Sequence, residues 1–263
     1  MPRALVTGAG KRLGRATALY LAGRGFNVAV HYANSQAGAE DTAAEIAAMG
    51  QRAFLLQADL LDEAAAQSLL PRAAAALGGR ITCLINNASI FEADDIHTAT
   101  RESWDRHIGS NLRAPFLLTQ AMAAQGLLPT RDENGEPRAP GLIVNMIDQR
   151  VHSLTPEFMS YTIAKMGLWA MTRTTAQALA PAIRVNGIGP GPTLQGQHQS
   201  ADVFAQERRD TVLGRGADPA DINAALGYFL DASTVTGQMI CTDGGQHLQW
   251  QNPEVSQTSD RMR

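Results

Sequence analysis

The chain has 263 residues, of which 44% are hydrophobic and 18% charged, and its formal net charge is −3. This length suits one large α/β domain with a sizeable core, and the balance of acids and bases argues against a nucleic-acid partner. The opening apolar run of three residues is too short for a signal peptide. No uncharged apolar stretch approaches the roughly 18 residues of a membrane-spanning helix. Two cysteines and six scattered histidines show no disulfide framework and no metal-ligand spacing. We therefore expect a cytoplasmic protein with no metal and no membrane partner.

Short apolar and β-branched runs alternate with alanine-rich segments from the N-terminus onward. Seven of these runs predict strands, at 4–7, 27–31, 53–57, 81–86, 142–147, 183–188 and 238–241. Segments between them, such as 38–49 and 64–77, repeat apolar residues at helical spacing. This alternation predicts right-handed βαβ units and a seven-stranded parallel sheet covered on both faces, in a single doubly wound α/β domain. We assign residues 1–250 to that catalytic domain, 251–263 to a polar tail, and the proline-containing segment 126–141 to a surface loop.

A glycine-rich turn follows the first predicted strand and opens a helix. It reads Thr7-Gly8-Ala9-Gly10-Lys11-Arg12-Leu13-Gly14. Glycines in this position allow a tight turn and close approach of the backbone to a pyrophosphate at the helix N-terminus. Arg12 can place its charge on that pyrophosphate or on a bound substrate, or it can simply face solvent.

The segment about 20 residues beyond the turn indicates which nicotinamide cofactor is used. An NAD site presents an acid there to the ribose 2′-hydroxyl, whereas this chain has no acid between His31 and Ser35. Asn34, Ser35 and backbone amides can instead donate to a 2′-phosphate, which favours NADPH. Ser35 can also cap the next helix, and Asp59 can hold the adenine amino group or cap the helix that follows it.

Tyr161 and Lys165 lie four residues apart in a helix-compatible run, so they share one face. An ammonium close to a phenol favours the phenolate, so we expect Lys165 to lower the pKa of Tyr161 and ease proton delivery. Such a pair on its own can also be an ordinary surface pair.

Several motifs accompany this pair in chain order: the glycine turn, Asn86-Asn87-Ala88-Ser89, Asn111, Pro190-Gly191-Pro192-Thr193 and Asp243-Gly244-Gly245. Together with Tyr161 and Lys165 they resemble the short-chain dehydrogenase/reductase superfamily along nearly the whole chain. The resemblance implies a Rossmann-type fold and a homotetramer.

The chain departs from that superfamily after the fifth predicted strand, where a serine is usual. Asp148 stands there, 13 residues before Tyr161. A carboxyl group in a partly buried cleft can be protonated and can relay a proton, which serine cannot do. Asp148 can alternatively cap the loop that follows it.

Arg12, the His31-Tyr32-Ala33-Asn34-Ser35 segment, Phe91 and Asp148 together resemble the pteridine reductase branch, with its dihydromonapterin and dihydrofolate reductases. Ala33 and Asn34 stand where that branch often has a basic residue. The resemblance implies a pterin ring stacked between the nicotinamide and Phe91, with Arg12 and Ser89 near its polar edge. An aromatic side chain beside a hydride site suits a flat heteroaromatic ligand, although Phe91 can equally be a core residue.

The turn, the motifs and the resemblance together assign residues to three roles. The catalytic residues are Asp148, Tyr161, Lys165 and Asn111. The substrate residues are Arg12, Ser89, Phe91, Asp148 and Tyr161. The cofactor residues are Gly8, Lys11, Arg12, Leu13, His31, Tyr32, Asn34, Ser35, Asp59, Leu60, Asn87, Ala88, Ser89, Met146, Tyr161, Lys165, Pro190, Gly191 and Thr193.

The function favoured by these residues is NADPH-dependent reduction of a dihydropteridine by hydride transfer, with the proton supplied by Asp148 and Tyr161. A second interpretation is reduction of a 3-oxoacyl thioester or another carbonyl, against which Asp148 argues. A third is a non-catalytic NADP-sensing regulator, which would need none of Asn111, Tyr161 and Lys165.

Overall fold

The computed structural model describes residues 1–196 and 199–249. Its core is a seven-stranded sheet whose neighbouring strands are all parallel, in the order β3-β2-β1-β4-β7-β8-β9. The strands are β1 (Arg3–Val6), β2 (Asn27–Tyr32), β3 (Ala53–Gln57), β4 (Cys83–Asn86), β7 (Gly141–Met146), β8 (Ile183–Pro190) and β9 (Met239–Thr242). The predicted doubly wound α/β fold and its seven parallel strands are confirmed.

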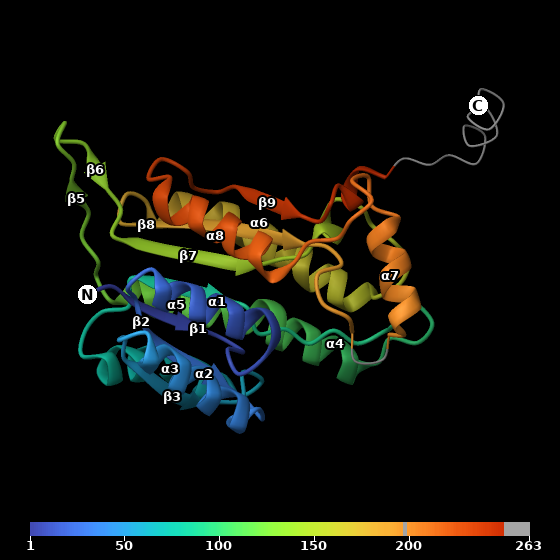
Figure 1. Ribbon diagram of the computed structural model, residues 1–263, viewed down its shortest axis with the longest axis horizontal. Helices are drawn as coiled ribbons and strands as arrows, with labels where there is room; N and C mark the ends of the chain where they lie inside the picture. Colours follow the sequence, from blue (N-terminus) through green and yellow to red (C-terminus); the bar gives the residue numbers. More distant parts are fainter. Residues whose placement is uncertain (197–198, 250–263) are drawn as a thin grey trace.

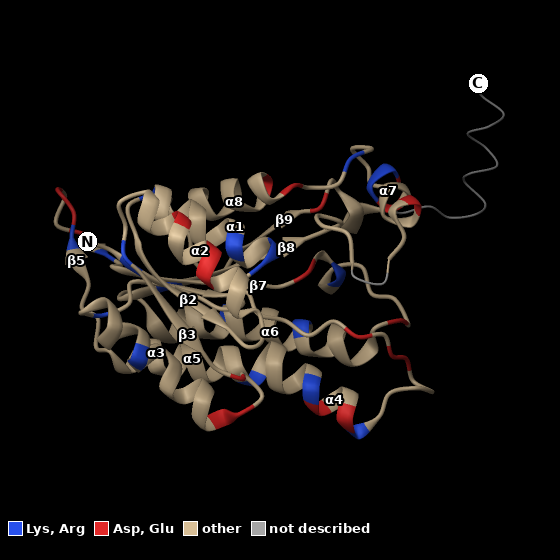
Figure 2. Cartoon of the chain, turned by 60° about the horizontal axis from the view of Figure 1, so that its bottom comes forward, with Lys and Arg blue, Asp and Glu red and all other residues tan. Residues whose placement is uncertain are grey.

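Helices cover both faces of the sheet, as alternating strands and helices require. They are α1 (Arg12–Gly23), α2 (Gln36–Ala48), α3 (Glu63–Leu77), α4 (Arg101–Ile108), α5 (Ala114–Ala124), α6 (Met159–Leu179), α7 (Ala201–Arg209) and α8 (Pro219–Asp231). One buried apolar cluster joins α1, α2 and α8 to the sheet, and a second joins α3 and α5 to its other face. Both signs of charge are scattered over the helices and loops, while most of the strand ribbon carries none (Figure 2).

The segment expected to be a surface loop contains a small hairpin. Its strands β5 (Thr130–Arg131) and β6 (Pro137–Arg138) pair antiparallel, and all four residues are exposed. Most of the segment is exposed, as expected for a surface loop, and the hairpin is an addition to that prediction. Asp132 accepts backbone N–H groups from Asn134 and Glu136 and closes a tight turn between the strands. In Figure 1 the hairpin lies at the opposite end of the sheet from α4 and α7.

Three short helices complete the described part: the five-residue π-helix η1 (Gly109–Arg113) between α4 and α5, and the 3₁₀ helices η2 (Gln149–Val151) and η3 (Gln246–Leu248). None of the described helices is long and apolar enough to cross a membrane. Within residues 1–196 and 199–249 there is also no cluster of metal-ligating side chains. The predicted tail at 251–263 lies outside the described residues.

Candidate active site

The glycine turn connects β1 to α1 and is packed too tightly for side chains. Gly8 has φ of +65°, and a Cβ on Gly14 would lie 2.2 Å from the Gly8 carbonyl oxygen. Lys11, the N-cap residue of α1, makes no side-chain capping bond. The first amides of α1 are therefore left to a ligand, which is the arrangement that holds phosphate groups at helix N-termini.

Arg12 bridges this turn to the segment after β8. Its guanidinium donates hydrogen bonds to the carbonyl oxygens of Gln195 at 2.8 Å and Leu194 at 3.0 Å. Its backbone has φ of +54°, a left-handed conformation that glycine adopts more easily than arginine. The five-donor guanidinium can serve these two carbonyls and a ligand anion together.

The residues expected at the ribose occupy different depths. His31 is buried and accepts a bond from Gly8 N through Nδ1 at 3.0 Å, while Nε2 donates to Ala58 O at 3.1 Å. Burial lowers the pKa of His31 to about 4, so the ring is neutral and supports the glycine turn from the inside. Tyr32 is half-buried and Asn34 is exposed.

Ser35 lies beside the glycine turn at the start of α2. It occupies the N-cap position, but its hydroxyl makes no capping bond, so that alternative is not realised by the side chain. A Cβ on Gly10 would lie 2.4 Å from Ser35 Oγ, which places the hydroxyl against the turn. One of the two alternatives for Asp59, that it caps the helix that follows, is wrong. Asp62 caps α3 instead and accepts bonds from Ala64 N and Ala65 N.

Asp148 and Tyr161 meet at the carboxyl end of β7. The Tyr161 hydroxyl donates to Asp148 Oδ2 at 2.8 Å, and Asp148 Oδ1 accepts a bond from Arg150 N at 2.9 Å. One carboxylate thus serves both of the alternatives raised by the sequence, because one oxygen caps η2 and the other contacts the phenol. Tyr161 is buried and Asp148 is partly exposed, so solvent reaches the pair from the side of the carboxylate.

The pKa of Tyr161 moves in the direction opposite to the one expected. Burial, followed by the charge of Asp148 and the hydrogen bond to it, raises the pKa of Tyr161 well above its usual value. Lys165 cannot counter this, because its Nζ donates to the Met146 carbonyl at 2.8 Å and lies 5.5 Å from the centre of the tyrosine ring. The expectation that Lys165 lowers the pKa of Tyr161 is therefore wrong, since Asp148 contacts the hydroxyl directly.

Lys165 is itself an unusual group. It is 2% exposed, and burial lowers its pKa to about 8, with partial compensation from Asp148. It is brought to the same edge of the sheet as Tyr161 because both lie near the N-terminus of α6. The shared face predicted from their spacing is confirmed by this arrangement.

Phe91 stands over the phenol. Its ring lies 4.7 Å from the Tyr161 ring in an edge-on arrangement and stacks on Phe158 with centroids 4.3 Å apart and planes 10° from parallel. Phe91 is 55% exposed, so the alternative of a core residue is wrong. Arg150, which lies on η2, has its guanidinium 5.1 Å from the centre of the Phe158 ring. A positive charge therefore lies beside the two stacked phenylalanine rings.

The loop between β4 and α4 is tied to the rest of the site by its neighbours. Asn111, in η1, accepts a bond from Ile90 N at 2.9 Å and donates to Ile90 O at 2.8 Å. Asn87 Nδ2 donates to Thr7 O at 2.7 Å, and Ala88 N donates to Thr7 Oγ1 at 2.9 Å. Asn111 therefore lies beside the loop that carries Phe91, with both of its polar groups engaged there.

The remaining assigned residues frame this edge of the sheet. Thr193 Oγ1 donates to Gly191 O at 3.0 Å after β8, and a Cβ on Gly191 would lie 2.6 Å from Asp243 Cβ. Among the other residues assigned to the cofactor, Lys11 and Ser89 are exposed, and Leu60 and Met146 are buried. The half-buried ones are Leu13, Asn87, Ala88 and Pro190.

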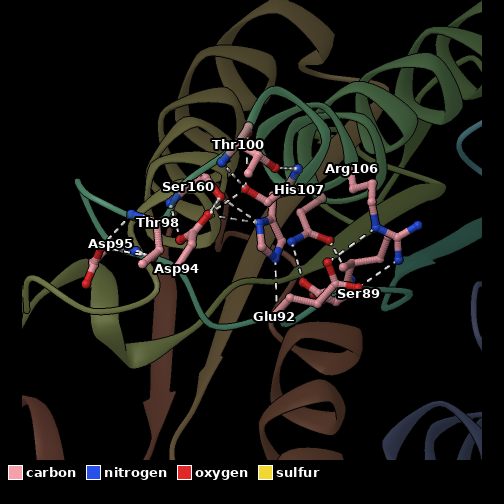
Figure 3. Close-up of polar contacts among 12 residues, drawn as sticks. Ser89, Glu92, Asp94, Asp95, Thr98, Thr100, Arg106, His107 and Ser160 are labelled. Carbon is pink, nitrogen blue, oxygen red and sulfur yellow. Dashed lines mark hydrogen bonds and ion pairs between the residues drawn. The ribbon is translucent and has the colours of Figure 1, made fainter.

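Sequence reasoning missed one group of polar residues at this edge, drawn in Figure 3. Asp94, His107 and Ser160 are all buried and lie together, although they come from a loop, α4 and α6. In the sequence they are isolated polar positions without a shared motif. An acid in an otherwise solvent-facing loop gives no local signal that it will be buried.

Comparison with known proteins agrees with this architecture. The family model described as enoyl-(acyl carrier protein) reductase matches residues 8–247. An uncharacterized oxidoreductase of Methylorubrum extorquens is 34% identical over 250 residues, covering 92% of this chain and 96% of that protein. The 3-oxoacyl-[acyl-carrier-protein] reductase FabG of Staphylococcus epidermidis is 30% identical, covering 93% and 98%.

A solved structure is more similar still. The FolM alternative dihydrofolate reductase 1 of Brucella canis, complexed with NADP, has 40% sequence identity and a TM-score of 0.88, covering 97% of each chain. The homologous FolM structure from Brucella suis, also in complex with NADP, has the same identity and TM-score. With a family model spanning the turn, the Asp148–Tyr161 pair and Lys165, this chain belongs to the short-chain dehydrogenase/reductase superfamily and is an NAD(P)-dependent reductase.

Proposed function

We propose that this protein reduces a dihydropteridine, of the dihydrobiopterin, dihydromonapterin or dihydrofolate type, with NADPH. The observation that carries the proposal is the 2.8 Å hydrogen bond between Tyr161 and Asp148 at the carboxyl end of β7. Reduction of a C=N bond leaves a ring nitrogen that must receive a proton, and a carboxyl group joined to a phenol can relay one. The 40% identity with the FolM alternative dihydrofolate reductase supports the same substrate class.

The cofactor-binding residues fit NADPH. The turn at Gly8–Gly14 offers uncapped amides at the start of α1 for the pyrophosphate, and the segment from His31 to Ser35 holds no acid that would repel a 2′-phosphate. Bound NADPH supplies the hydride. Lys165, buried beside Tyr161, holds the nicotinamide ribose with its ammonium and keeps a positive charge near the phenol.

Proton delivery follows from the order of the polar groups. Because its pKa is raised, the Tyr161 phenol stays protonated and can act as an acid. Asp148 is partly exposed, so it can take a proton from water and return it to the phenol after each turnover. Phe91 offers one ring face to a flat ligand, since Phe158 covers its other face. Arg12 and Ser89 stand at the polar edge of that ligand.

The competing activity is reduction of a 3-oxoacyl thioester, the reaction named for the FabG relatives. Carbonyl reduction needs a neutral hydrogen-bond donor beside the tyrosine, and a carboxylate at Asp148 is an acceptor. The proposed assembly is a homotetramer, as the superfamily resemblance implies, which light scattering on the purified protein would measure.

The test is steady-state oxidation of NADPH with dihydrobiopterin, dihydromonapterin and dihydrofolate, compared with an acetoacetyl thioester. We expect turnover of at least one dihydropteridine and little of the thioester. Asp148→Asn keeps the size of the side chain but cannot take up and release a proton, so dihydropteridine turnover collapses, and Asp148→Ser does not restore it. Preference for the thioester by the unmodified protein, or full pterin activity in Asp148→Asn, would overturn the proposal.

Phe91→Ala refines the assignment of the ring site. Loss of one stacking contact is worth about 0.5–1.5 kcal/mol, so the KM for the dihydropteridine rises roughly twofold to tenfold with little change in kcat. Phe54→Ala is the matched control, since Phe54 is 39% exposed on β3 at the far edge of the sheet.

A further inference from the structure

Helix α6, which carries Tyr161 in its first turn, is not capped by the residue that precedes it. Phe158 holds the N-cap position with φ of +54° and offers no side-chain cap. The donors of the first turn are served instead by Asp94, a residue of the loop between β4 and α4. Asp94 O accepts a bond from Met159 N at 3.2 Å, and Asp94 Oδ1 accepts one from Ser160 N at 3.1 Å.

The cap is reinforced by a buried relay of hydrogen bonds (Figure 3). The Ser160 hydroxyl donates to Asp94 Oδ2, and Ser103 Oγ donates to the same oxygen at 3.1 Å. Burial works against the carboxylate form of Asp94, but these bonds hold its pKa below its usual value. A carboxylate at the N-terminus of a 21-residue helix also interacts favourably with the helix dipole.

His107 joins this cap to the loop that carries Phe91. Its Nε2 accepts a hydrogen bond from Glu92 N at 3.1 Å, which leaves Nδ1 as the protonated nitrogen of the neutral ring. Nδ1 then donates to Ser160 Oγ, 2.6 Å away. Burial lowers the pKa of His107 and keeps this ring neutral. One imidazole thus contacts the neighbour of Phe91 through one nitrogen and the neighbour of Tyr161 through the other.

Two groups proposed to act on the substrate therefore have a common support. Phe91 is 55% exposed and has a Phe158 ring on one side only, so packing alone does not hold it in place. Tyr161 lies directly after Ser160, and its ring touches that of Phe91. A small shift of the loop relative to α6 would change the spacing between the stacking face and the proton donor.

We propose that Asp94, His107 and Ser160 are positioning residues that set the place of Phe91 relative to the Tyr161 hydroxyl. His107 acts on Phe91 through Glu92, and on Tyr161 through Ser160 and Asp94. This inference rests on the proposed roles of Phe91 and Tyr161, and it adds a reason why a buried histidine and a buried acid stand beside them.

Two substitutions of His107 separate its two contacts. His107→Asn retains a donor at the place of Nδ1 and loses the acceptor at Nε2, so Ser160 keeps its partner while Glu92 loses one. His107→Gln retains an acceptor at the place of Nε2 and loses the donor to Ser160. We expect His107→Asn to raise the KM for the dihydropteridine and His107→Gln to lower kcat, each by roughly threefold to tenfold, the effect of one lost hydrogen bond.

A purely structural role would change both constants together in both variants, and that result would overturn the proposal. Ser160→Ala serves if either histidine variant fails to fold, because it removes only a hydroxyl; it is expected to lower kcat and leave KM unchanged. Asp105→Asn is the control, since Asp105 is exposed on α4 and pairs with Arg101. It removes a negative charge two residues before His107 in the same helix, and no change in kcat or KM is expected.

Hydrogen exchange tests the same contacts without any substrate. In Asp94→Ala the amide of Ser160 loses its Asp94 Oδ1 acceptor and is expected to exchange at least tenfold faster than in the unmodified protein, whereas in Asp105→Asn it is unchanged. The amide of Met159 keeps its bond to the Asp94 backbone carbonyl and serves as the internal reference. Equal exchange in Asp94→Ala would overturn the proposed cap. If the unmodified protein reduces only the thioester, the pterin assignment fails, and the kcat effect of His107→Gln is measured on the thioester instead.

Discussion

The carboxyl edge of the sheet has two parts that are built by different means. Around β1 and β2 the proposed cofactor site consists of glycines, backbone amides and polar side chains such as the exposed Asn34 and the half-buried Ser35. Around β4, β7 and α6 the proposed reaction site consists of buried polar and ionisable side chains, with Tyr161, Lys165 and His107 each at most 5% exposed. The first part depends on close backbone packing, and the second depends on the stabilisation of groups that burial disfavours. Substitutions in the two parts should therefore have different effects on kcat, on NADPH binding and on the stability of the protein.

The largest expected effect is on the reaction side. Tyr161→Phe removes the proton donor and leaves the ring in place, so kcat falls by roughly 10²–10⁴-fold, as for other lost general acids. NADPH binding, followed by quenching of intrinsic fluorescence, stays within a small factor of the unmodified protein. Near-normal turnover in Tyr161→Phe would show that the proton comes from another group. The buried side chains around α6 would then not form the reaction site that we contrast with the cofactor site.

Lys165→Met is expected to change activity and stability in opposite directions, as a buried ionisable group of the reaction site should. We expect weaker NADPH binding and lower kcat, because the ammonium holds the ribose and lies beside the phenol. A lysine whose pKa falls to about 8 on folding is penalised below that pH, and the penalty fades as the pH rises toward its unfolded value. The variant should therefore unfold at higher urea concentration than the unmodified protein at pH 7, with a smaller advantage at pH 10. Lower stability of the variant at both pH values would contradict this account.

Gly14→Ala tests the backbone part. The new Cβ would lie 2.2 Å from the Gly8 carbonyl oxygen, so the turn must shift, with a stability loss of about 1–3 kcal/mol and weaker NADPH binding. Gly23→Ala in the same helix is the matched control. It meets no atom within 4 Å and should stabilise the protein by roughly 0.5–1 kcal/mol. Urea unfolding curves measure both, and equal effects of the two variants would refute the role of close packing.

The smallest effect is expected for Ser35, a half-buried side chain of the proposed cofactor site. Ser35→Asp places a carboxylate where a 2′-phosphate is expected, and the ratio of KM values for NADPH and NADH should move toward NADH. The change is up to about fivefold, because exposed charge interactions are worth roughly 0.2–1 kcal/mol. Equal kinetic constants with both cofactors in the unmodified protein would already count against the NADPH preference.

The two parts also differ in how far the sequence predicts them. The glycine turn and the Tyr161–Lys165 spacing are local patterns, and each predicts an arrangement that the structure contains. The absence of an acid before Ser35 is a local pattern too, and the NADPH preference drawn from it stays a prediction. The seven strands were predictable for the same reason, since a buried parallel strand is a short apolar run wherever it occurs. The two-residue strands of the hairpin are too short and too exposed to produce such a pattern.

The buried support of the reaction side was not predictable because its contacts are distant in the chain. Ser160 lies 53 residues from His107 and 66 from Asp94. The pKa of Tyr161 differs from the predicted direction for a related reason: the sequence shows that Lys165 is near the tyrosine, but only the fold shows that Asp148 contacts the hydroxyl. Electrostatic predictions from helical spacing therefore need the position of every other charge.

Arg12 has a consequence for how this chain can change over time. One residue supplies both the left-handed corner of the turn and the guanidinium that reaches Leu194 and Gln195. Glycine would relax the corner and release the segment after β8, whereas lysine would keep the charge and lose the forked contact. No single replacement improves one task without harming the other. Because both contacts end on backbone carbonyl oxygens, which every residue supplies, a substitution at Leu194 or Gln195 would not restore what the loss of Arg12 removes.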